Sequence, residues 1–398
     1  MKRWRSVLVV FLVVLAAGGL FGALYPHVWA SPDGDQDLGS VLEVIGLLNT
    51  RYYYQPISTF DLLDSYNRKG NINGMLRDAL EDPYTRYMTP QAFDQMMTST
   101  RGEYGGIGIV VGMQDDQLTV VSPFKGTPGD RAGLRAGDRI RAIDGRPTTY
   151  MSLDEAVSLM RGPQGEDITL TIGRGDTEFD VYIVRDIINV VSVEEPKMLE
   201  HQIGYIKMTN FSERTHDELL EGLAQLDEQD MQGLILDLRF NPGGTLGAAI
   251  QVADTFIAQG PLVFLEDRDG NRSPYMADAR GTREPLPMAV LINGSSASAS
   301  EIVAGALQDN GLAVLVGSKT FGKGLVQSLH PLRDGSALTI TEQGYLTSGG
   351  RNINTLGIEP DVFVEVDEEA EEALYLGDEE VVDEQLNQAI EIILEALR

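Results

Sequence analysis

A cluster of small and hydroxyl-bearing residues follows an apolar segment and precedes a helical pattern. Residues 291–302 read Leu-Ile-Asn-Gly-Ser-Ser-Ala-Ser-Ala-Ser-Glu-Ile. Small residues permit a sharp turn and the close approach of a substrate backbone, and amides at a helix start stabilise an anion. A hydroxyl at this turn would be exposed at the end of a strand. The cluster therefore predicts a nucleophilic serine, with an ordinary helix cap as the alternative.

A lysine between two glycines follows, in the sequence Thr-Phe-Gly-Lys-Gly over residues 320–324. The glycines indicate that Lys323 is held on a closely packed backbone. A lysine must be neutral to accept the proton of a serine, and burial lowers its pKa because it disfavours the charged form. We therefore expect Lys323 to act as a general base and Gln327 to hold its amine by a hydrogen bond. A surface turn is the alternative.

A third turn, Asn-Pro-Gly-Gly at residues 241–244, also ends an apolar strand pattern before a helix. Free amides at Gly243 or Gly244 would help to stabilise the oxyanion of a tetrahedral intermediate, together with the amide that follows the nucleophile. A plain connection between strand and helix is the alternative.

The composition argues against other chemistries and partners. The chain has no cysteine, which excludes thiol nucleophiles, thiolate metal sites and disulfides. A net charge of −29 argues against nucleic acid, which requires a positive surface. No two histidines have metal-ligand spacing, so no metal or cofactor is expected. The histidines of the chain are His27, His201, His216 and His330.

Two other serine enzymes fit poorly. A Ser-His-Asp hydrolase needs a histidine oriented by a carboxylate, and His330, which follows the Lys323 strand, has no obvious carboxylate partner. The Ser-x-x-Lys spacing of Ser122 and Lys125 occurs without the accompanying motifs of penicillin-recognising enzymes.

Several elements position these turns. Apolar strand patterns alternate with helical ones from residue 202 to residue 364, which predicts α/β architecture. Residues 38–97 predict several short helices. Acidic residues 367–372 and 378–380 predict a solvated segment. An amphipathic helix at 383–397 is expected to pack on the body or on a second subunit, which leaves a homodimer open.

Residues 102–188 read as short strands with glycine-rich turns. Gly105, Gly106, Ile107 and Gly108 precede an apolar strand. Glycines at positive φ can turn their amides into one space, which captures a peptide's terminal carboxylate, and the strand edge can accept the peptide as an added strand. A simple tight turn is the alternative. Residues 127–140, which contain Ala-Gly-Leu-Arg-Ala-Gly-Asp-Arg-Ile, resemble PDZ domains.

The N-terminus predicts export. Lys2, Arg3 and Arg5 precede an apolar run at residues 7–24, and the aliphatic Val28 and the small Ala30 stand before Ser31. This pattern is typical of a signal peptide cleaved after Ala30 and equally of a retained membrane anchor. Either places the rest of the chain outside the cytoplasm, in the periplasm or cell envelope.

The three turns together resemble the C-terminal processing peptidases, also called tail-specific proteases. Further matching segments are Gly-Ala-Leu-Gln-Asp at 305–309, Gly-Ile-Glu-Pro-Asp at 357–361 and Asp-Pro-Tyr-Thr-Arg-Tyr at 82–87. The resemblance covers nearly everything after residue 38. Departures are Phe240, where a polar residue is common, and Thr-Ser-Gly-Gly at 347–350.

The resemblance implies the roles of single residues. The nucleophile would be Ser298, the base Lys323 and the supporting residue Gln327, with oxyanion amides at Gly243 and Ala299. It also implies a serine endopeptidase with a crotonase-like α/β core, an N-terminal helical segment and a PDZ domain that binds or gates substrate.

The resemblance implies partners as well. These are protein substrates with free apolar C-termini, with an adaptor or regulatory protein left open. A non-catalytic PDZ scaffold is the alternative function. The expected domains are the leader 1–30, helices 31–101, PDZ domain 102–188, peptidase core 189–366 and C-terminal segment 367–398.

Overall fold

The computed structural model describes residues 38–114, 117–376 and 381–398. The expected leader lies outside the described residues, and none of the helices that are described has the length and apolarity to cross a membrane. The chain divides into two units, which we describe separately. The first takes the described residues up to Asp94, with Ala253–Pro285 and Ile292–Glu365, and the second takes Gln95–Val252, Leu286–Leu291 and Val366–Arg398.

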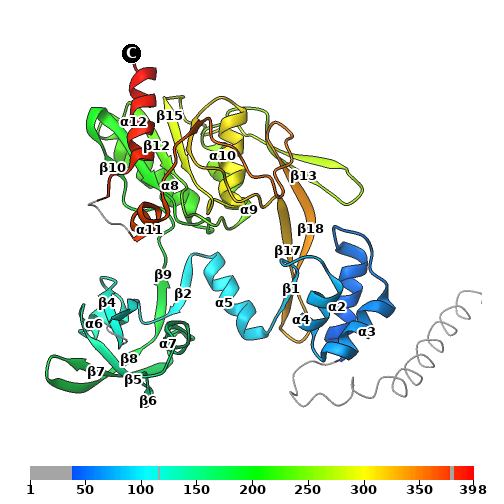
Figure 1. The fold of residues 1–398 in the computed structure, drawn as a ribbon, viewed down its shortest axis with the longest axis vertical. Coiled ribbons are helices and arrows are strands. Elements are labelled where there is room, and N and C mark those ends of the chain that lie inside the picture. The colour runs from blue at the N-terminus through cyan, green and yellow to red at the C-terminus, as the bar shows by residue number, and fades with distance from the viewer. Residues whose placement is uncertain (1–37, 115–116, 377–380) are drawn as a thin grey trace, which may run out of the picture. The chain divides into compact units, whose positions relative to one another are not determined.

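The first unit is built around the long strand β18 (Ala337–Thr347). This strand pairs antiparallel with β17 (Leu325–Pro331), β1 (Arg86–Met88) and β13 (Pro261–Glu266), and β13 pairs with β14 (Arg272–Met276). The strands β17 and β18 lie side by side in Figure 1. Gln327 faces Thr341 across this pair, so the sheet fixes the strand that follows Lys323.

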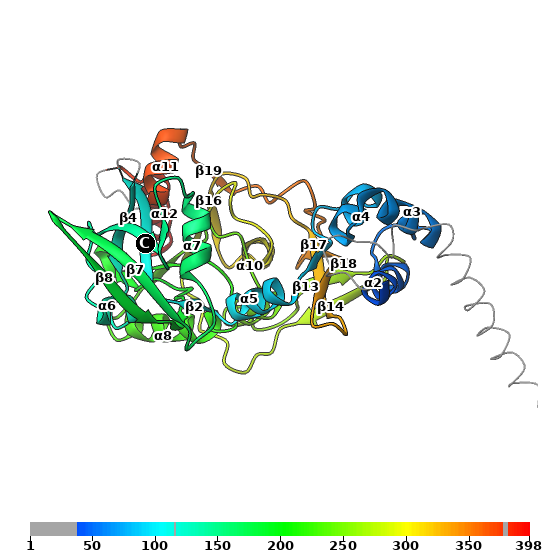
Figure 2. The ribbon, with the colours of Figure 1, turned by 90° about the horizontal axis from the view of Figure 1, so that it is seen from below.

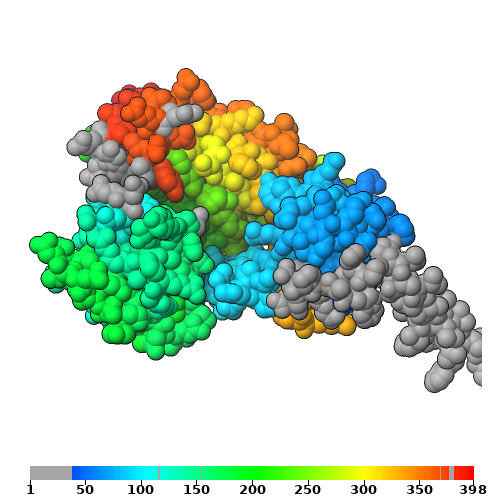
Figure 3. Space-filling view, turned by 60° about the horizontal axis from the view of Figure 1, so that its bottom comes forward, coloured from blue at the N-terminus to red at the C-terminus, as the bar shows by residue number. Residues whose placement is uncertain are grey.

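Three helices cover this sheet: α2 (Leu38–Arg51), α3 (Thr59–Lys69) and α4 (Ile72–Ala79). They gather beside β17 and β18 in Figure 2, and the blue surface in the space-filling view of Figure 3 belongs to this N-terminal region. The apolar face of α2 is buried and shares one core with Leu338 and Ile340 of β18. The prediction of short helices in this region is confirmed. A fourth helix, α5 (Pro90–Thr100), follows β1.

A buried helix, α10 (Ala299–Asp309), completes the first unit. Its residues from Ala299 to Leu307 are all buried, because it packs against β13, β18 and the strand β16 (Val314–Gly317). The strand β16 pairs in parallel with β19 (Val362–Phe363). A helix surrounded in this way holds its first residue in a fixed place.

The second unit contains parallel strands joined by helices. The strand β11 (Ile203–Lys207), the helix α8 (Thr215–Asp227) and the strand β12 (Gly233–Asp237) form one strand–helix–strand unit, and β15 (Met288–Ile292) pairs in parallel with β12. Every residue of β12 is buried, as expected of a parallel strand covered on both faces. The α/β prediction is confirmed. The remaining elements here are β10 (Lys197–Met198), η2 (Glu200–Gln202) and α9 (Leu246–Asp254).

The glycine-rich region forms a small antiparallel sheet with two helices. Its strand order is β3-β4-β5-β7-β8, with β6 beside β5, and a separate ribbon joins β2 to β9. Ser152 accepts a hydrogen bond from the amide of Glu155 and so caps the first turn of the helix α7. The bounds are β2 (Glu103–Gly106), β3 (Ile109–Gln114), β4 (Gln117–Pro123), α6 (Pro128–Arg131), β5 (Arg139–Ile143), β6 (Arg146–Pro147), α7 (Leu153–Met160), β7 (Asp167–Arg174), β8 (Thr177–Val184) and β9 (Asp186–Asn189).

The C-terminal segment is more ordered than its acidic sequence predicts. Part of the expected solvated segment forms the helix α11 (Glu368–Leu376), whose Tyr375 ring meets Phe240 edge to face with ring centroids 5.4 Å apart. The helix α12 (Glu384–Ala396) lies beside β12 (Figure 1). The amphipathic helix therefore packs on the body of the chain.

A buried ion pair ties this last helix to the end of β12. The guanidinium of Arg239 donates to both oxygens of Asp383 at 2.8 Å and to Asp237 at 2.6–3.1 Å. The two carboxylates and the hydrogen bonds they accept raise the pKa of Arg239 despite its burial. The Asn-Pro-Gly-Gly turn begins two residues after Arg239.

Candidate active site

Ser298 lies at the first turn of α10 in an unusual backbone conformation. Its φ of 55° and ψ of −111° fall outside the regions that residues with a side chain normally occupy. Such a conformation costs about 1–3 kcal/mol and persists only where the surroundings enforce it. Here Tyr345, which is fully buried, donates its hydroxyl to the carbonyl of Ser298 at 3.1 Å. Strain at a hydroxyl residue between a strand and a helix is typical of a nucleophile held for reaction.

Lys323 lies on a tightly packed backbone, as its flanking glycines predict. Gly322 has a φ of +90°, and a Cβ there would lie 2.8 Å from the amide nitrogen of Gly357. At Gly324 a Cβ would lie 2.7 Å from the amide nitrogen of Asn354. Neither position therefore accepts a side chain, and the segment is fixed against residues 354–357.

Glu301 joins the serine segment to the lysine segment. Its side chain is fully buried. One carboxylate oxygen, Oε2, accepts the amides of Ser298 at 2.8 Å and Lys323 at 2.9 Å. The other, Oε1, accepts the hydroxyl of Thr320 at 2.6 Å and the amide of Gly322 at 2.7 Å. Four donors on one carboxylate hold the backbones of Ser298 and Lys323 next to each other.

The amine of Lys323 points toward an aromatic ring. Its Nζ lies 4.6 Å from the centroid of the Tyr84 ring, a distance typical of a cation–π contact. Within the described parts of the chain, no hydrogen bond joins this Nζ to the Oγ of Ser298. The structure therefore brings the backbones of Ser298 and Lys323 together, while the amine of Lys323 contacts the ring of Tyr84.

The surroundings of the amine favour its neutral form. Burial lowers the pKa of Lys323, and the nearby positive charge of Arg86 lowers it further. The carboxylates of Asp82 and Glu301 oppose this effect without cancelling it. A lysine with a lowered pKa is suited to remove a proton from a serine.

This lowered pKa leads to a prediction on pH dependence. Peptide hydrolysis should increase as the pH rises through the pKa of Lys323, because only the neutral amine acts as a base, and the midpoint should lie below the ordinary lysine value of 10.5. The measurement is kcat/KM against pH for a substrate without groups that titrate in this range. Lys319→Ala should keep the same midpoint, since Lys319 is half exposed and pairs with Glu359. A midpoint at the ordinary lysine value would contradict the assignment.

Gln327 lies in β17, on the strand that follows Lys323. Its Nε2 donates to the Oγ1 of Thr341 at 3.4 Å. Its expected hydrogen bond to the amine of Lys323 is not made in this arrangement of the described residues. The role of Gln327 in orienting the amine stays a prediction.

The two amides expected to stabilise the oxyanion differ from each other in whether they already donate a hydrogen bond. Ala299 is the first residue of α10, and the first amides of a helix have no acceptor within the helix, which leaves this one available. The amide of Gly243 donates to the Oδ1 of Asn241 at 2.9 Å, so it must be released before it can bind an oxyanion. Gly243 belongs to the second unit. Both roles stay predictions.

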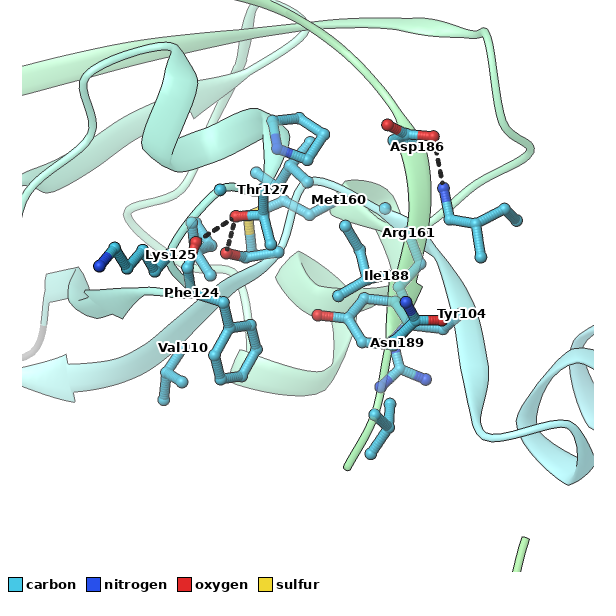
Figure 4. Close-up of a pocket in the computed structure, with 18 of the residues that line it drawn as sticks. Tyr104, Val110, Phe124, Lys125, Thr127, Met160, Arg161, Asp186, Ile188 and Asn189 are labelled. Carbon is cyan, nitrogen blue, oxygen red and sulfur yellow. Dashed lines mark hydrogen bonds between the residues drawn. The ribbon is translucent and has the colours of Figure 1, made fainter. Parts of the chain in front are cut away.

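A groove of about 810 Å³ runs along the small antiparallel sheet (Figure 4). Of the four residues expected to bind a carboxylate, Gly106, Ile107 and Gly108 line it. Gly105 instead packs against the carbonyl of Gly162, where a Cβ would lie only 2.2 Å away. The groove is also lined by the apolar side chains of Val111, Phe124, Val157 and Met160.

The loop at the end of this groove has free donors. Gly108 has a φ of +70°, as a turned amide requires, whereas Gly105 and Gly106 form part of β2. The carbonyls of Ile107 and Gly108 accept bonds from residues 124–129. Among the described residues, no acceptor faces the amides of Ile107 and Gly108, so both can receive a terminal carboxylate.

One histidine expectation is wrong. His330 does have a carboxylate partner, because its Nε2 lies 2.8 Å from the Oε1 of Glu342 on the neighbouring strand. The sequence conceals this pair because the two residues meet only when β17 and β18 form a hairpin. In the described structure His330 makes no hydrogen bond to a serine, so the pair does not create a Ser-His-Asp arrangement.

Glu301, Tyr84 and Tyr345 are site residues that the sequence analysis did not identify. A signal exists for Glu301, since a serine followed three residues later by glutamate is the signature of a capping box. Tyr84 lies within the Asp-Pro-Tyr-Thr-Arg-Tyr segment, but nothing in that segment points to Lys323. Tyr345 lies in an apolar strand pattern, and nothing in that pattern distinguishes it from its neighbours.

Family models match two parts of the chain. Residues 202–364 match peptidase family S41, and residues 119–174 match the PDZ domain. The chain is 44% identical over 301 residues to the carboxy-terminal-processing protease of Bartonella bacilliformis, covering 74% of this chain and 68% of the relative. It is 39% identical to the carboxyl-terminal-processing protease of Picosynechococcus, covering 80% and 77%.

Solved structures of known proteases are similar to this chain as well. The photosystem II D1 C-terminal processing protease is 28% identical, with a TM-score of 0.54 over 82% of this chain and 92% of that one. A putative S41 protease from Bacteroides fragilis has a TM-score of 0.59 at 16% identity, covering 92% and 99%, which shows the shared fold.

Proposed function

Because the chain belongs to peptidase family S41, among the carboxyl-terminal-processing proteases, and carries their PDZ domain, we propose that Ser298 and Lys323 are its catalytic dyad. The enzyme is a serine-type peptidase. The observation that carries the dyad is the Glu301 carboxylate, which accepts the amides of both residues. A non-catalytic scaffold has no need of that bridge, nor of a lysine whose pKa is lowered by burial.

The proposed reaction has two stages. The amine of Lys323 leaves the Tyr84 ring and takes the proton of Ser298, whose Oγ attacks the scissile carbonyl carbon. The amide of Ala299, with that of Gly243 once Asn241 releases it, stabilises the oxyanion. The intermediate then expels the amine product, which takes the proton from Lys323, and leaves an ester on Ser298. Water activated by Lys323 hydrolyses this ester in the second stage.

The contact with Tyr84 defines the resting position of the base. A cation over an aromatic face is stabilised by about 0.5–2 kcal/mol, so the charged amine is held on Tyr84 until it loses its proton. Gln327 would hold the neutral amine after it turns toward Ser298. Bound substrate would favour the loss of the proton from the Lys323 amine, because it excludes water from the site and so further disfavours the charged form of the amine.

The PDZ groove would bind a protein substrate by its free C-terminus. The amides of Ile107 and Gly108 would bind the terminal carboxylate, and the apolar side chains of the groove would take the last side chains. The substrate class that follows is loosely folded protein with an apolar C-terminus, cut internally by the peptidase core.

A terminal carboxylate bound in this way leads to a prediction. Amidating the C-terminus of a protein substrate should reduce kcat/KM by about 10- to 100-fold, because charge-assisted hydrogen bonds contribute about 1.5–3 kcal/mol. Product formation by chromatography measures the effect. Acetylating the N-terminus of the same substrate removes a charge at the other end and should change little. Equal rates for the amidated and free forms would rule out carboxylate recognition.

The proposed location is outside the cytoplasm. It is supported by Lys2, Arg3 and Arg5 before the apolar run at 7–24, which would serve as a signal peptide or an inner-membrane anchor. A homodimer and an adaptor or regulatory protein are further proposed partners.

A further inference from the structure

A second cleft, of about 800 Å³, lies in the first unit. Three consecutive tyrosines, Tyr52, Tyr53 and Tyr54, form one wall directly after α2. The rest of the lining includes Leu80 and Glu81, which follow α4. It also includes Asp269, in the turn between β13 and β14. We call it the tyrosine cleft.

The rings of the tyrosine cleft form a connected aromatic surface. Tyr54 lies edge to face against both of its neighbours, with ring centroids 5.5 Å from Tyr52 and 5.3 Å from Tyr53. Tyr52 is buried, while Tyr54 is 41% exposed. One ring therefore anchors the wall and another remains open to a ligand. The face of an aromatic ring is negative, so it attracts cations.

Carboxylates surround these rings. Glu81 and Asp269 line the cleft, and Asp82 lies close enough to raise the pKa of Tyr52 and Tyr54, whose burial is the larger cause. Glu266 acts in the same way on Tyr53. Arg268 is the one positive residue of the lining, at an exposed position of the turn. The cleft thus combines aromatic faces with an excess of negative charge.

The tyrosine cleft adjoins the proposed dyad. Glu81 is three residues before Tyr84, so their Cα atoms are at most about 11 Å apart, and Tyr84 carries the amine of Lys323 on its ring. From the other side, the amide of Tyr53 donates at 2.9 Å to the carbonyl of Thr341, whose hydroxyl accepts Gln327. Two segments of the cleft wall are therefore connected to the surroundings of Lys323, one through Tyr84 and the other through Thr341 and Gln327.

We propose that the tyrosine cleft is a substrate subsite for a lysine or arginine side chain of the polypeptide that is cleaved. The inference rests on the proposed peptidase function. A long cationic side chain can place its charge over the Tyr54 ring and between Glu81 and Asp269 while its methylene stem packs on Leu80. The cleft would select cleavage sites near a basic residue, separately from the selection of C-termini by the PDZ groove.

Binding tests this subsite without turnover. We would measure fluorescence anisotropy of labelled peptides with full-length Ser298→Ala protein, moving one lysine through successive positions while the C-terminus stays constant. Each lysine is compared with norleucine, which has a similar stem and no charge. At one position lysine should bind about tenfold more tightly. Tyr54→Leu and Glu81→Gln should each remove that preference.

Matched controls separate the cleft from the general acidity of the chain. Tyr150→Leu and Glu284→Gln change exposed residues outside the cleft and should keep the preference. Equal binding of lysine and norleucine peptides at every position would overturn the inference, as would tighter binding of norleucine, which would indicate an apolar subsite. A lysine preference that survives both cleft variants would place the basic side chain elsewhere and would overturn it too.

Turnover by the unmodified protein reports separately on the proposed function. If it cleaves the peptides without regard to lysine, the peptidase proposal stands and the cleft inference fails. If it cleaves none of them, the peptidase proposal fails, and the anisotropy comparison still decides whether the cleft binds a basic side chain.

Discussion

Replacing Lys323 with alanine is expected to reduce kcat for peptide hydrolysis by about 10²- to 10⁴-fold, the range that a general base contributes. Ser298→Ala should abolish turnover, because no other group forms the covalent intermediate. The physical reason is that water and the remaining side chains cannot remove the serine proton at neutral pH. Single-turnover measurements at several enzyme concentrations would detect the residual rate.

Two controls make this test specific. Lys319→Ala removes a lysine four residues earlier, on a half-exposed side chain paired with Glu359, and should retain full activity. Peptide binding to the PDZ groove should be unchanged in Ser298→Ala and Lys323→Ala. Full activity of the Lys323 variant would refute the dyad, whereas loss of both binding and activity would indicate misfolding.

Replacing Glu301 with glutamine is expected to lower the stability of the first unit by about 2–4 kcal/mol, because buried hydrogen bonds to a charged group are lost. All four partners of the carboxylate donate to it. An amide has only one accepting atom, so its NH₂ group must face the amide of Gly322 or those of Ser298 and Lys323. Activity should fall at least about tenfold even where the variant is folded, since displacement of about 1 Å at a catalytic group costs about 10²-fold.

Scanning calorimetry measures the stability change, and the initial rate well below the transition measures the activity. Glu359→Gln is the matched control, because Glu359 is 71% exposed and surface substitutions usually change stability by less than about 0.5 kcal/mol. A Glu301→Gln protein with normal stability and normal kcat would show that the bridge does not position the dyad.

The sequence predicts much of this site because its signals are local. The glycines beside Lys323 indicate a backbone without room for side chains, and the structure has that packing against residues 354–357. The strand and helix patterns from residue 202 onward predict the α/β core, since apolar periodicity follows directly from burial. The spacing of Ser152 and Glu155 is likewise a local signal of a helix start, and the hydroxyl of Ser152 accepts the amide of Glu155 at the start of α7.

The remaining features depend on contacts between distant segments. Tyr84 and Lys323 are far apart in the chain, so no local pattern reports that the ring of one supports the amine of the other. Glu301 looks like a capping residue, yet three of its four donors, Thr320, Gly322 and Lys323, belong to another loop. The carboxylate partner of His330 appears only after two strands pair. The acidic sequence of α11 conceals the apolar contact of Tyr375.

During synthesis Arg239 is made well before its partner Asp383, which lies 144 residues later in the chain. A guanidinium buried without its second carboxylate is costly, by about 3–5 kcal/mol when one partner of such a pair is missing. The end of β12 therefore cannot reach its final stability until residue 383 has left the ribosome, although β12 itself was translated long before. A nascent chain that has not yet exposed residue 383 would carry the serine and the lysine but not the anchor of the Asn-Pro-Gly-Gly turn, so this turn reaches its final stability only after both catalytic segments have been made.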